Sequence, residues 1–257
     1  MICKKKRLRI LVHNVLSTLL YLISDEKNFV VVTGSDSSHF KSLCQMLFSL
    51  SIHCRDQTKI IVYDLGFNYS ERSFLLNNFK KIDLRTFDYS LYPAYFNIKI
   101  NAGEYAWKPV IFREVLMENK GIVCWMDAGN IVTEPLKKLR KITKFCGLYS
   151  PYSFGTIKDW THPGTLEYLD AANDILDKRN LTAGFVSAYY NNLSVVSLVN
   201  KWSNCALVKR CIAPVGSGKH NHRQDQAVLS VLAHKEGIPK SYLKYLQVGV
   251  VTHQDID

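Results

Sequence analysis

Short, almost uninterrupted apolar runs alternate with helical patterns over residues 28–127, and this alternation limits the fold more than any other feature of the chain. Runs with strand-like composition occupy residues 29–33, 59–65, 82–87 and 122–126. Apolar residues at helical spacing fill the intervals at residues 39–52, 70–79 and 104–119. Strands covered on both faces have such continuous apolar sequences, and a βαβα order favours a parallel sheet between two layers of helices. We therefore predict an α/β fold: a single Rossmann-like domain whose mostly parallel central sheet is flanked by helices.

The chain divides into a short N-terminal segment, residues 1–27, and one domain, residues 28–257, because no internal repeat or linker interrupts the latter. The segment holds Lys4-Lys5-Lys6-Arg7 and then a mostly apolar run, which is shorter than the roughly 20 residues of a spanning helix. A basic amphipathic helix in contact with an anionic membrane surface and a helix packed on the domain both fit this pattern. An N-terminal signal anchor is a third alternative. We expect a cytoplasmic protein at the periphery of the membrane, with the Golgi lumen as the alternative location.

Positive charge dominates the composition, with 33 Lys and Arg against 22 Asp and Glu and a formal net charge of +11. Such an excess favours anionic partners, among them nucleic acids, acidic phospholipids and phosphorylated small molecules. The basic residues cluster only at residues 4–9 and 137–144, so we expect no specific nucleic-acid partner. The seven cysteines are scattered and form no CxxC pair, which predicts ordinary buried thiols in a reducing compartment.

Polar residues follow the predicted strands at the edge where parallel sheets bind ligands. Thr33-Gly34-Ser35-Asp36 follows the first strand, Asp64 lies near the end of the second, and Asp127-Ala128-Gly129-Asn130 follows the fourth. The first of these segments is neither a GK[ST] phosphate loop nor a GxGxxG fingerprint. It fits a small turn beneath a base or ribose, and it fits an ordinary strand-to-helix turn equally well.

Two longer segments, EYAWKP at residues 104–109 and IVCWMDAGNIV at residues 122–132, resemble the core of the GT-A glycosyltransferases. The resemblance is greatest to the retaining family that includes glycogenin and bacterial lipopolysaccharide galactosyltransferases. In that family a helix opens with Tyr-Ala-Arg, and an apolar strand ends in an Asp-x-Asp motif followed by Ile-Val. AGFV at residues 183–186, HRQDQAVL at 222–229 and VTH at 251–253 are similar to later segments of the family, in its order. The resemblance spans residues 29–253 and implies a GT-A fold that acts on a nucleotide sugar.

A metal site is part of what the resemblance implies, with Mn²⁺ or Mg²⁺ held by Asp127 and His253. Gly129 stands where the family has its second metal-binding Asp, so a metal-independent site is an alternative. Asn130 offers a neutral oxygen one position later. Apart from the resemblance, a carboxylate at a strand end suits a hard metal ion or ribose hydroxyls, although an Asp there can also cap a turn.

The resemblance also implies roles for other side chains. Lys108 matches the family's Arg that contacts the nucleotide, and a lysine suits a phosphate as a point charge. Asp225 and Gln226 match the Asp-Gln segment and are the candidate catalytic residues, with Asp225 acting as a base or as a ligand of the reacting sugar. The candidate acceptor or sugar contacts are Gly184, His222 and Arg223. The candidate nucleotide-sugar site comprises Thr33, Gly34, Ser35, Asp64, Lys108, Asp127, Ala128 and Asn130. A solvated lysine and a helix-start carboxylate are the structural alternatives for Lys108 and Asp225.

The resemblance implies a glycosyltransferase that transfers a sugar from a nucleotide-diphosphate sugar, with UDP as the expected nucleotide, to a hydroxyl of a glycan or lipid-linked acceptor. The first alternative is a sugar-nucleotide nucleotidyltransferase, although the turn after the first strand lacks the Arg of a GxGxR-type loop. The second is an inactive transferase-like protein, which the Gly at position 129 suggests. A basic nucleic-acid-binding module is the third.

Overall fold

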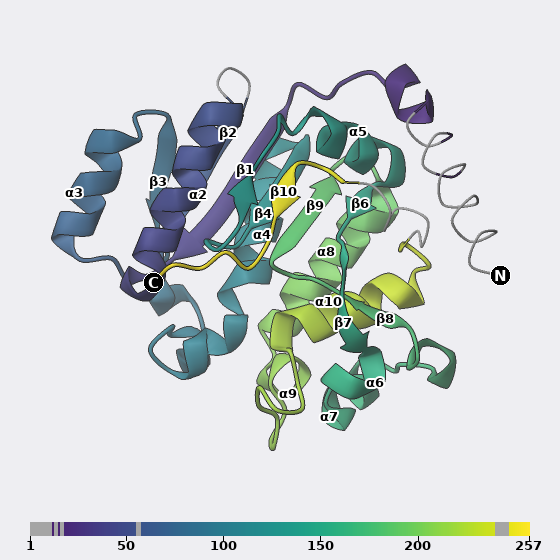
Figure 1. Ribbon diagram of the computed structural model, residues 1–257. Helices are drawn as coiled ribbons and strands as arrows, with labels where there is room; N and C mark the ends of the chain where they lie inside the picture. The colour runs from purple at the N-terminus through teal and green to yellow at the C-terminus, as the bar shows by residue number, and fades with distance from the viewer. Residues whose placement is uncertain (1–11, 13–14, 16–17, 55–57, 240–246) are drawn as a thin grey trace.

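In the computed structural model, which describes residues 12, 15, 18–54, 58–239 and 247–257, six strands form a central sheet (Figure 1). Their order across the sheet is β3 (Ile82–Thr86), β2 (Lys59–Asp64), β1 (Phe29–Ser35), β4 (Ile122–Met126), β9 (Phe185–Tyr189) and β6 (Leu148–Tyr149). The first four strands are parallel to one another, and β9 runs antiparallel to its neighbours β4 and β6. The predicted α/β fold with a mostly parallel sheet is confirmed.

Helices cover both faces of this sheet, which explains the continuous apolar sequence of β1. Val30 and Val32 belong to the core that includes α4 (Trp107–Asn119) and α8 (Leu193–Ala206). Phe29 and Val31 belong to the core that includes α2 (Phe40–His53) and α5 (Lys137–Cys146). Since successive side chains of a strand point to opposite faces, a strand between two helical layers has to be apolar at every position.

Smaller elements complete the molecule around this sheet. β5 (Ile131–Val132) pairs with β10 (Val250–Val251), and β7 (Tyr152–Thr156) pairs with β8 (Arg179–Leu181). The other helices are α3 (Tyr69–Asn78), α6 (Ile157–Trp160), α7 (Pro163–Tyr168), α9 (Lys209–Ile212) and α10 (Gln224–Lys235), with 3-10 turns at Ser37–His39, Tyr89–Leu91, Ala94–Phe96, Asn101–Tyr105 and Asn173–Ile175. The C-terminal segment, yellow in Figure 1, crosses the sheet and ends beside α2.

The helix expected at residues 104–119 begins later than the apolar pattern suggested. Asn101–Tyr105 is a separate 3-10 turn with left-handed backbone at Ala102, Gly103 and Glu104, and α4 starts at Trp107. A Cβ at Gly103 would lie 2.2 Å from the carbonyl oxygen of Phe96, so only glycine fits this turn. The abrupt turn places Lys108 in the first turn of α4 instead of on a continuous helix.

The cysteine prediction is wrong for one pair, because Cys205 and Cys211 form a disulfide between α8 and α9. Cys44, Cys54 and Cys124 are free thiols among the described residues, while Cys3 lies outside them.

Most of the N-terminal apolar run lies outside the described residues, and its expected membrane contact is therefore not assessed by this structure. Residues 18–22 are helical. Within the described part of the chain, none of the helices has the length and apolar character needed to cross a membrane.

Candidate active site

A cavity of about 310 Å³ opens at the carboxyl ends of the parallel strands, the edge at which the sequence placed the ligand. We call it the edge cavity. The sequence-predicted residues that line it are Gly34, Ser35, Lys108, Asp127, Ala128, Asn130, Gly184 and His253. They come from β1, from α4, from the loops after β4 and β8, and from the C-terminal segment. The fold thus gathers residues that are remote in sequence around one space.

Lys108 is the central charge of the site, because its ammonium lies between two carboxylates. Its Nζ is 3.0 Å from Oδ1 of Asp127 and 3.2 Å from Oδ2 of Asp225, and only 4% of the lysine side chain is exposed. Burial alone would lower the pKa of Lys108, but the carboxylates of Asp127 and Asp225 raise it above its ordinary value. The lysine is therefore charged at neutral pH and held in place, unlike a solvated surface lysine.

Asp225 enters the site from the first turn of α10, and its side chain is only 6% exposed. Burial and the charge of Asp127 raise the pKa of Asp225 while the neighbouring Lys108 lowers it, and the net pKa is about 6. The indole N–H of Trp202 donates to the backbone oxygen of Asp225 at 2.8 Å and fixes the start of the helix. A carboxylate this buried and this perturbed is a candidate for a role in chemistry.

Asp127 presents its carboxylate to the edge cavity with 46% of its side chain exposed. The indole N–H of Trp125 donates to Oδ1 of Asp127 at 2.6 Å, and the backbone N–H of Asp127 donates to the oxygen of Gly184 at 2.9 Å. A Cβ at Gly184 would lie 2.8 Å from Oδ2 of Asp127, so glycine leaves the space that this carboxylate occupies. The amide of Asn130 donates to the oxygen of Gly184 at 2.7 Å and thereby holds the two loops together.

Asp64 and His222 were expected to contact the substrate, but neither is among the residues that line the edge cavity, and both are held by hydrogen bonds to neighbouring residues. Asp64 accepts from the backbone N–H groups of Gly66 at 2.8 Å and Phe67 at 2.6 Å, and it pairs with Arg72. His222 is fully buried. It accepts at Nδ1 from the N–H of His162 at 3.1 Å, and its Nε2 lies 2.8 Å from the oxygen of Ile212. Both side chains hold the fold in this arrangement.

Three further candidates also lie outside the lining of the edge cavity. Thr33 is buried in β1, and its hydroxyl has no hydrogen-bond partner among the residues that the structure describes. The guanidinium of Arg223 lies 4.2 Å from the ring centre of Trp160, where it packs as a cation on an aromatic face. Gln226 is partly buried in the first turn of α10, directly after Asp225.

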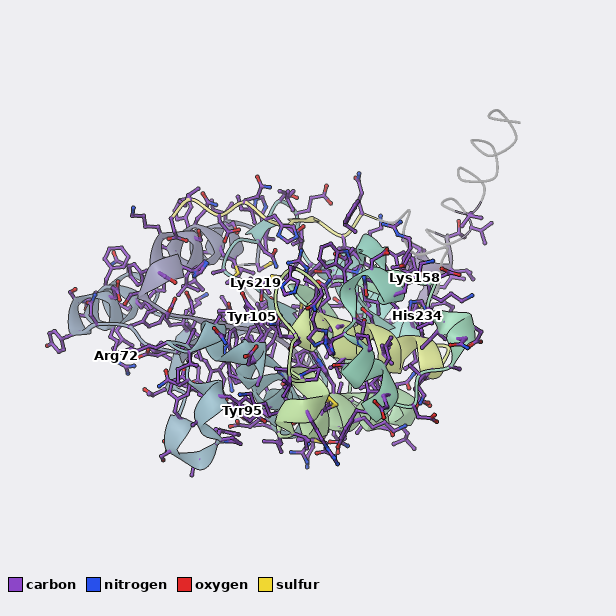
Figure 2. All side chains as sticks on the ribbon, turned by 90° about the horizontal axis from the view of Figure 1, so that it is seen from below. Arg72, Tyr95, Tyr105, Lys158, Lys219 and His234 are labelled. Carbon is purple, nitrogen blue, oxygen red and sulfur yellow. A yellow bond between two sulfur atoms is a disulfide. The ribbon has the colours of Figure 1, made fainter. Side chains whose placement is uncertain are left out.

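Several residues of the site were missed by the sequence analysis. Tyr105 lines the edge cavity, and Figure 2 shows it next to Lys219, whose ammonium is 5.8 Å from the ring centre. Trp125 binds Asp127 from the strand itself. Asp255 of the C-terminal segment also lines the cavity. The apolar pattern around Trp125 predicts only a core residue, and nothing in the sequence around Asp255 distinguishes it from a surface aspartate.

The donors that line the edge cavity fit a hard divalent cation in their chemistry. Asp127 and Asp255 offer carboxylate oxygens and His253 offers an imidazole nitrogen, the ligand types that suit Mn²⁺ or Mg²⁺. Within the described ranges, no three His, Cys, Asp or Glu side chains already stand together as a ready-made metal site. A cation bound here would take its remaining ligands from the substrate and from water, and the metal remains a prediction.

Comparison with known proteins places the fold. A family model described as a protein of unknown function, DUF1647, matches residues 5–113, and a search of curated proteins finds no match. A structure of LgtC carrying an active-site substitution has 15% identity and a TM-score of 0.55 over 87% of this chain and 86% of that one. Apo mouse xyloside xylosyltransferase 1 has 9% identity and a TM-score of 0.51 over 86% of this chain and 96% of that one.

The apo structure of the bifunctional glycosyltransferase WbbM gives the same result, with 15% identity and a TM-score of 0.53 over 82% of this chain. The match spans 38% of the WbbM chain, so the present protein corresponds to a part of that larger one. At such low identities the similarity concerns the fold. The chain has the GT-A glycosyltransferase fold, which confirms the expectation from the sequence resemblance.

Proposed function

We propose that this protein is a glycosyltransferase that moves a sugar from a nucleotide-diphosphate donor, with UDP as the nucleotide, to a hydroxyl of a glycan or a lipid-linked acceptor. The observation that carries the proposal is the buried ammonium of Lys108 between Asp127 and Asp225 at the ligand-binding edge of a GT-A sheet. A galactosyltransferase with a similar structure, LgtC, has been solved in complex with donor and acceptor sugar analogues.

The donor diphosphate belongs in the edge cavity beside Lys108. When the bond between the sugar and the diphosphate breaks, negative charge develops on the leaving oxygen, and a fixed cation stabilises that charge without having to reorganise. Lys108 meets this requirement because it is buried and held by two carboxylates. Gly34 and Ser35 form the adjoining wall, where a base or ribose can approach the backbone closely.

The metal of this proposal is Mn²⁺ or Mg²⁺, which when bound would neutralise the diphosphate as a Lewis acid. Asp127 and His253 are the residues that we propose hold it, and both line the edge cavity. The hydrogen bond from Trp125 orients the Asp127 carboxylate, since the indole N–H can only donate.

Asp225 is the proposed contact to the reacting sugar or to the acceptor hydroxyl, with Gln226 next to it on α10. Neutral pH lies above the pKa of about 6 of Asp225, so its ionised carboxylate accepts hydrogen bonds. Lys108 lines the edge cavity and touches Asp225, so a diphosphate that attracts Lys108 also alters the surroundings of Asp225. This contact couples donor binding to the proposed catalytic carboxylate.

For the location, we now favour the alternative, the Golgi lumen, over the cytoplasm. The support is the Cys205–Cys211 disulfide, since disulfides persist in oxidising compartments and are rare in the cytosol. For a luminal protein, residues 1–27 would act as an N-terminal signal anchor, and this role rests on their sequence alone.

A panel of nucleotides tests the function. UDP and UDP-sugars, with and without Mn²⁺, should raise the midpoint of thermal unfolding, since a ligand at about 100 times its Kd adds roughly 2.7 kcal/mol to the free energy of unfolding. Incubation of the stabilising donor with glycan acceptors should then release UDP. Stabilisation by a nucleoside triphosphate and a sugar phosphate, without any by a nucleotide sugar, would indicate the nucleotidyltransferase instead. Indifference to every nucleoside diphosphate would contradict the proposal.

A further inference from the structure

The charged side chains that line the edge cavity are mostly negative, which opposes the binding of a diphosphate without an added cation. Among the described residues that line it, Lys108 is positive while Asp36, Asp127 and Asp255 are negative, so one positive and three negative charges leave −2 with neutral imidazoles. Lys108 is in addition shared with the buried Asp225. An incoming diphosphate would meet repulsion from these carboxylates, which a divalent ion between them removes.

Gly129, the residue that replaces the expected second metal-binding Asp, faces another carboxylate. A Cβ built on Gly129 would lie 2.4 Å from Oδ2 and 2.5 Å from Oδ1 of Asp255. The backbone of Gly129 is outside the left-handed region, so its conformation does not require glycine. What requires glycine is space, because the carboxylate of Asp255 stands where a side chain at position 129 would begin.

The C-terminal segment, residues 252–257, is fastened on both sides of Asp255. The N–H of Gln254 donates to the oxygen of Gly129 at 2.7 Å. Asp257 accepts from the N–H of Lys41 at 3.0 Å and from the hydroxyl of Ser42 at 2.5 Å, at the positive N-terminal end of α2. Asp255 lies between these anchors, and within the described part of the chain its carboxylate makes no hydrogen bond or ion pair. An unpaired carboxylate is thus held at the wall of the cavity.

We propose that Asp255 supplies the second carboxylate ligand of a divalent cation in the edge cavity, in the place that Gly129 leaves open. The proposal rests on the function proposed above, since the diphosphate completes the shell of the ion. The second carboxylate, expected at position 129, would thus come from the C-terminal segment. His253 and Asp255 would both belong to the C-terminal segment and Asp127 to the loop after β4, and all three line the edge cavity.

Mn²⁺ titrations followed by electron paramagnetic resonance test this assignment in the full chain, with and without UDP. Wild type should bind Mn²⁺ with UDP present, and Asp255→Ala should raise the Mn²⁺ concentration for half-saturation by about tenfold or more. Asp255 is solvent-exposed, so the melting temperature without ligand should stay unchanged. Asp170→Ala removes an equal charge from a fully exposed site and should leave Mn²⁺ binding as in wild type.

A carboxylate swap makes the test specific to position. Gly129→Asp alone should perturb the site, since the new side chain meets Asp255. Gly129→Asp combined with Asp255→Ala should restore Mn²⁺ affinity to within about threefold of wild type, because the carboxylate returns from the other side of the same space.

Three outcomes would overturn the assignment. Unchanged Mn²⁺ affinity in Asp255→Ala, or UDP binding by wild type without any Mn²⁺ uptake, would refute it while the transferase proposal stands. Absence of UDP binding to wild type would refute both proposals together.

Discussion

Replacing Lys108 by Met should leave an unpaired, buried carboxylate in the site. Met keeps most of the length of the side chain and removes only the ammonium. The buried carboxylate of Asp225 would then face Asp127 without a cation between them. Breaking a buried ion pair by removing one partner costs about 3–5 kcal/mol, since the remaining charge is desolvated and unpaired. We expect a loss of that size in the free energy of unfolding at pH 8.

The loss should be smaller in mild acid, and its direction follows from the pKa of Asp225. In wild type this pKa is about 6, above its ordinary value of 3.8, because burial outweighs the lowering by Lys108. The native state therefore holds more protons than the unfolded state between about pH 4 and pH 6, and stability falls as the pH rises through that window. Without Lys108 the native pKa moves higher, so in Lys108→Met the fall continues above pH 6. Each further pKa unit adds about 1.4 kcal/mol.

Urea denaturation at pH 5 and pH 8 measures this effect. Asp225→Asn in the Lys108→Met background removes the unpaired charge and should recover most of the stability lost at pH 8. Asp225→Asn alone leaves Lys108 paired with Asp127 and should abolish sugar transfer while changing UDP affinity little. Equal destabilisation of Lys108→Met at both pH values, or no recovery in the double variant, would refute the argument that Lys108 neutralises Asp225.

Two further predictions concern residues around the site. Burial lowers the pKa of His222 to about 4, below its ordinary 6.5, so the unfolded state alone takes up the proton between these values. The free energy of unfolding should fall by about 3 kcal/mol as the pH drops from 6.5 to 4. Denaturation curves of His222→Gln should lack this pH-dependent loss, and the same dependence on pH in the variant and in wild type would contradict the prediction. Gly184→Ala would put a Cβ 2.8 Å from Oδ2 of Asp127 and displace that carboxylate. We expect UDP affinity to fall by about tenfold with less than about 1 kcal/mol lost in unfolding, since only a side-chain end has to move; unchanged affinity in a titration would contradict this.

The polar residues that the sequence places at the carboxyl ends of the strands divide into two groups in the structure, and the difference has a physical cause. Asp127 extends into the edge cavity for two reasons. The indole N–H of Trp125 donates to its carboxylate, and Gly184 has no side chain that would occupy the space of that carboxylate. Asp64 occupies the same kind of position on β2, but its carboxylate turns back to the N–H groups of Gly66 and Phe67. The sequence shows an Asp at a strand end in both cases and does not show which hydrogen bonds it makes.

Tertiary contacts likewise explain what the sequence could not provide. The resemblance made His222 a candidate contact to the acceptor or sugar, yet in the structure its imidazole is bonded to the backbone of His162 and Ile212. Asp225, three positions later, reaches Lys108 because the start of α10 packs against the 3-10 turn Asn101–Tyr105, which leads into α4. From the sequence alone, Gly129 indicates a missing metal ligand. In the structure Asp255 fills the space beside Gly129, and the fold brings it there, not any local sequence pattern.

The charges of the edge cavity connect these observations into one expectation for ligand binding. Lys108 is shared by two carboxylates, and the carboxylates that line the cavity outnumber it. A divalent cation therefore reduces the repulsion between the carboxylates and a diphosphate. A bound diphosphate in turn adds negative charge that attracts the cation. Coupling between two ligands is reciprocal, so the factor by which Mn²⁺ increases the affinity for UDP has to equal the factor by which UDP increases the affinity for Mn²⁺. Asp255→Ala removes one of the charges that make the cation necessary, and that shared factor should shrink in both titrations by the same amount.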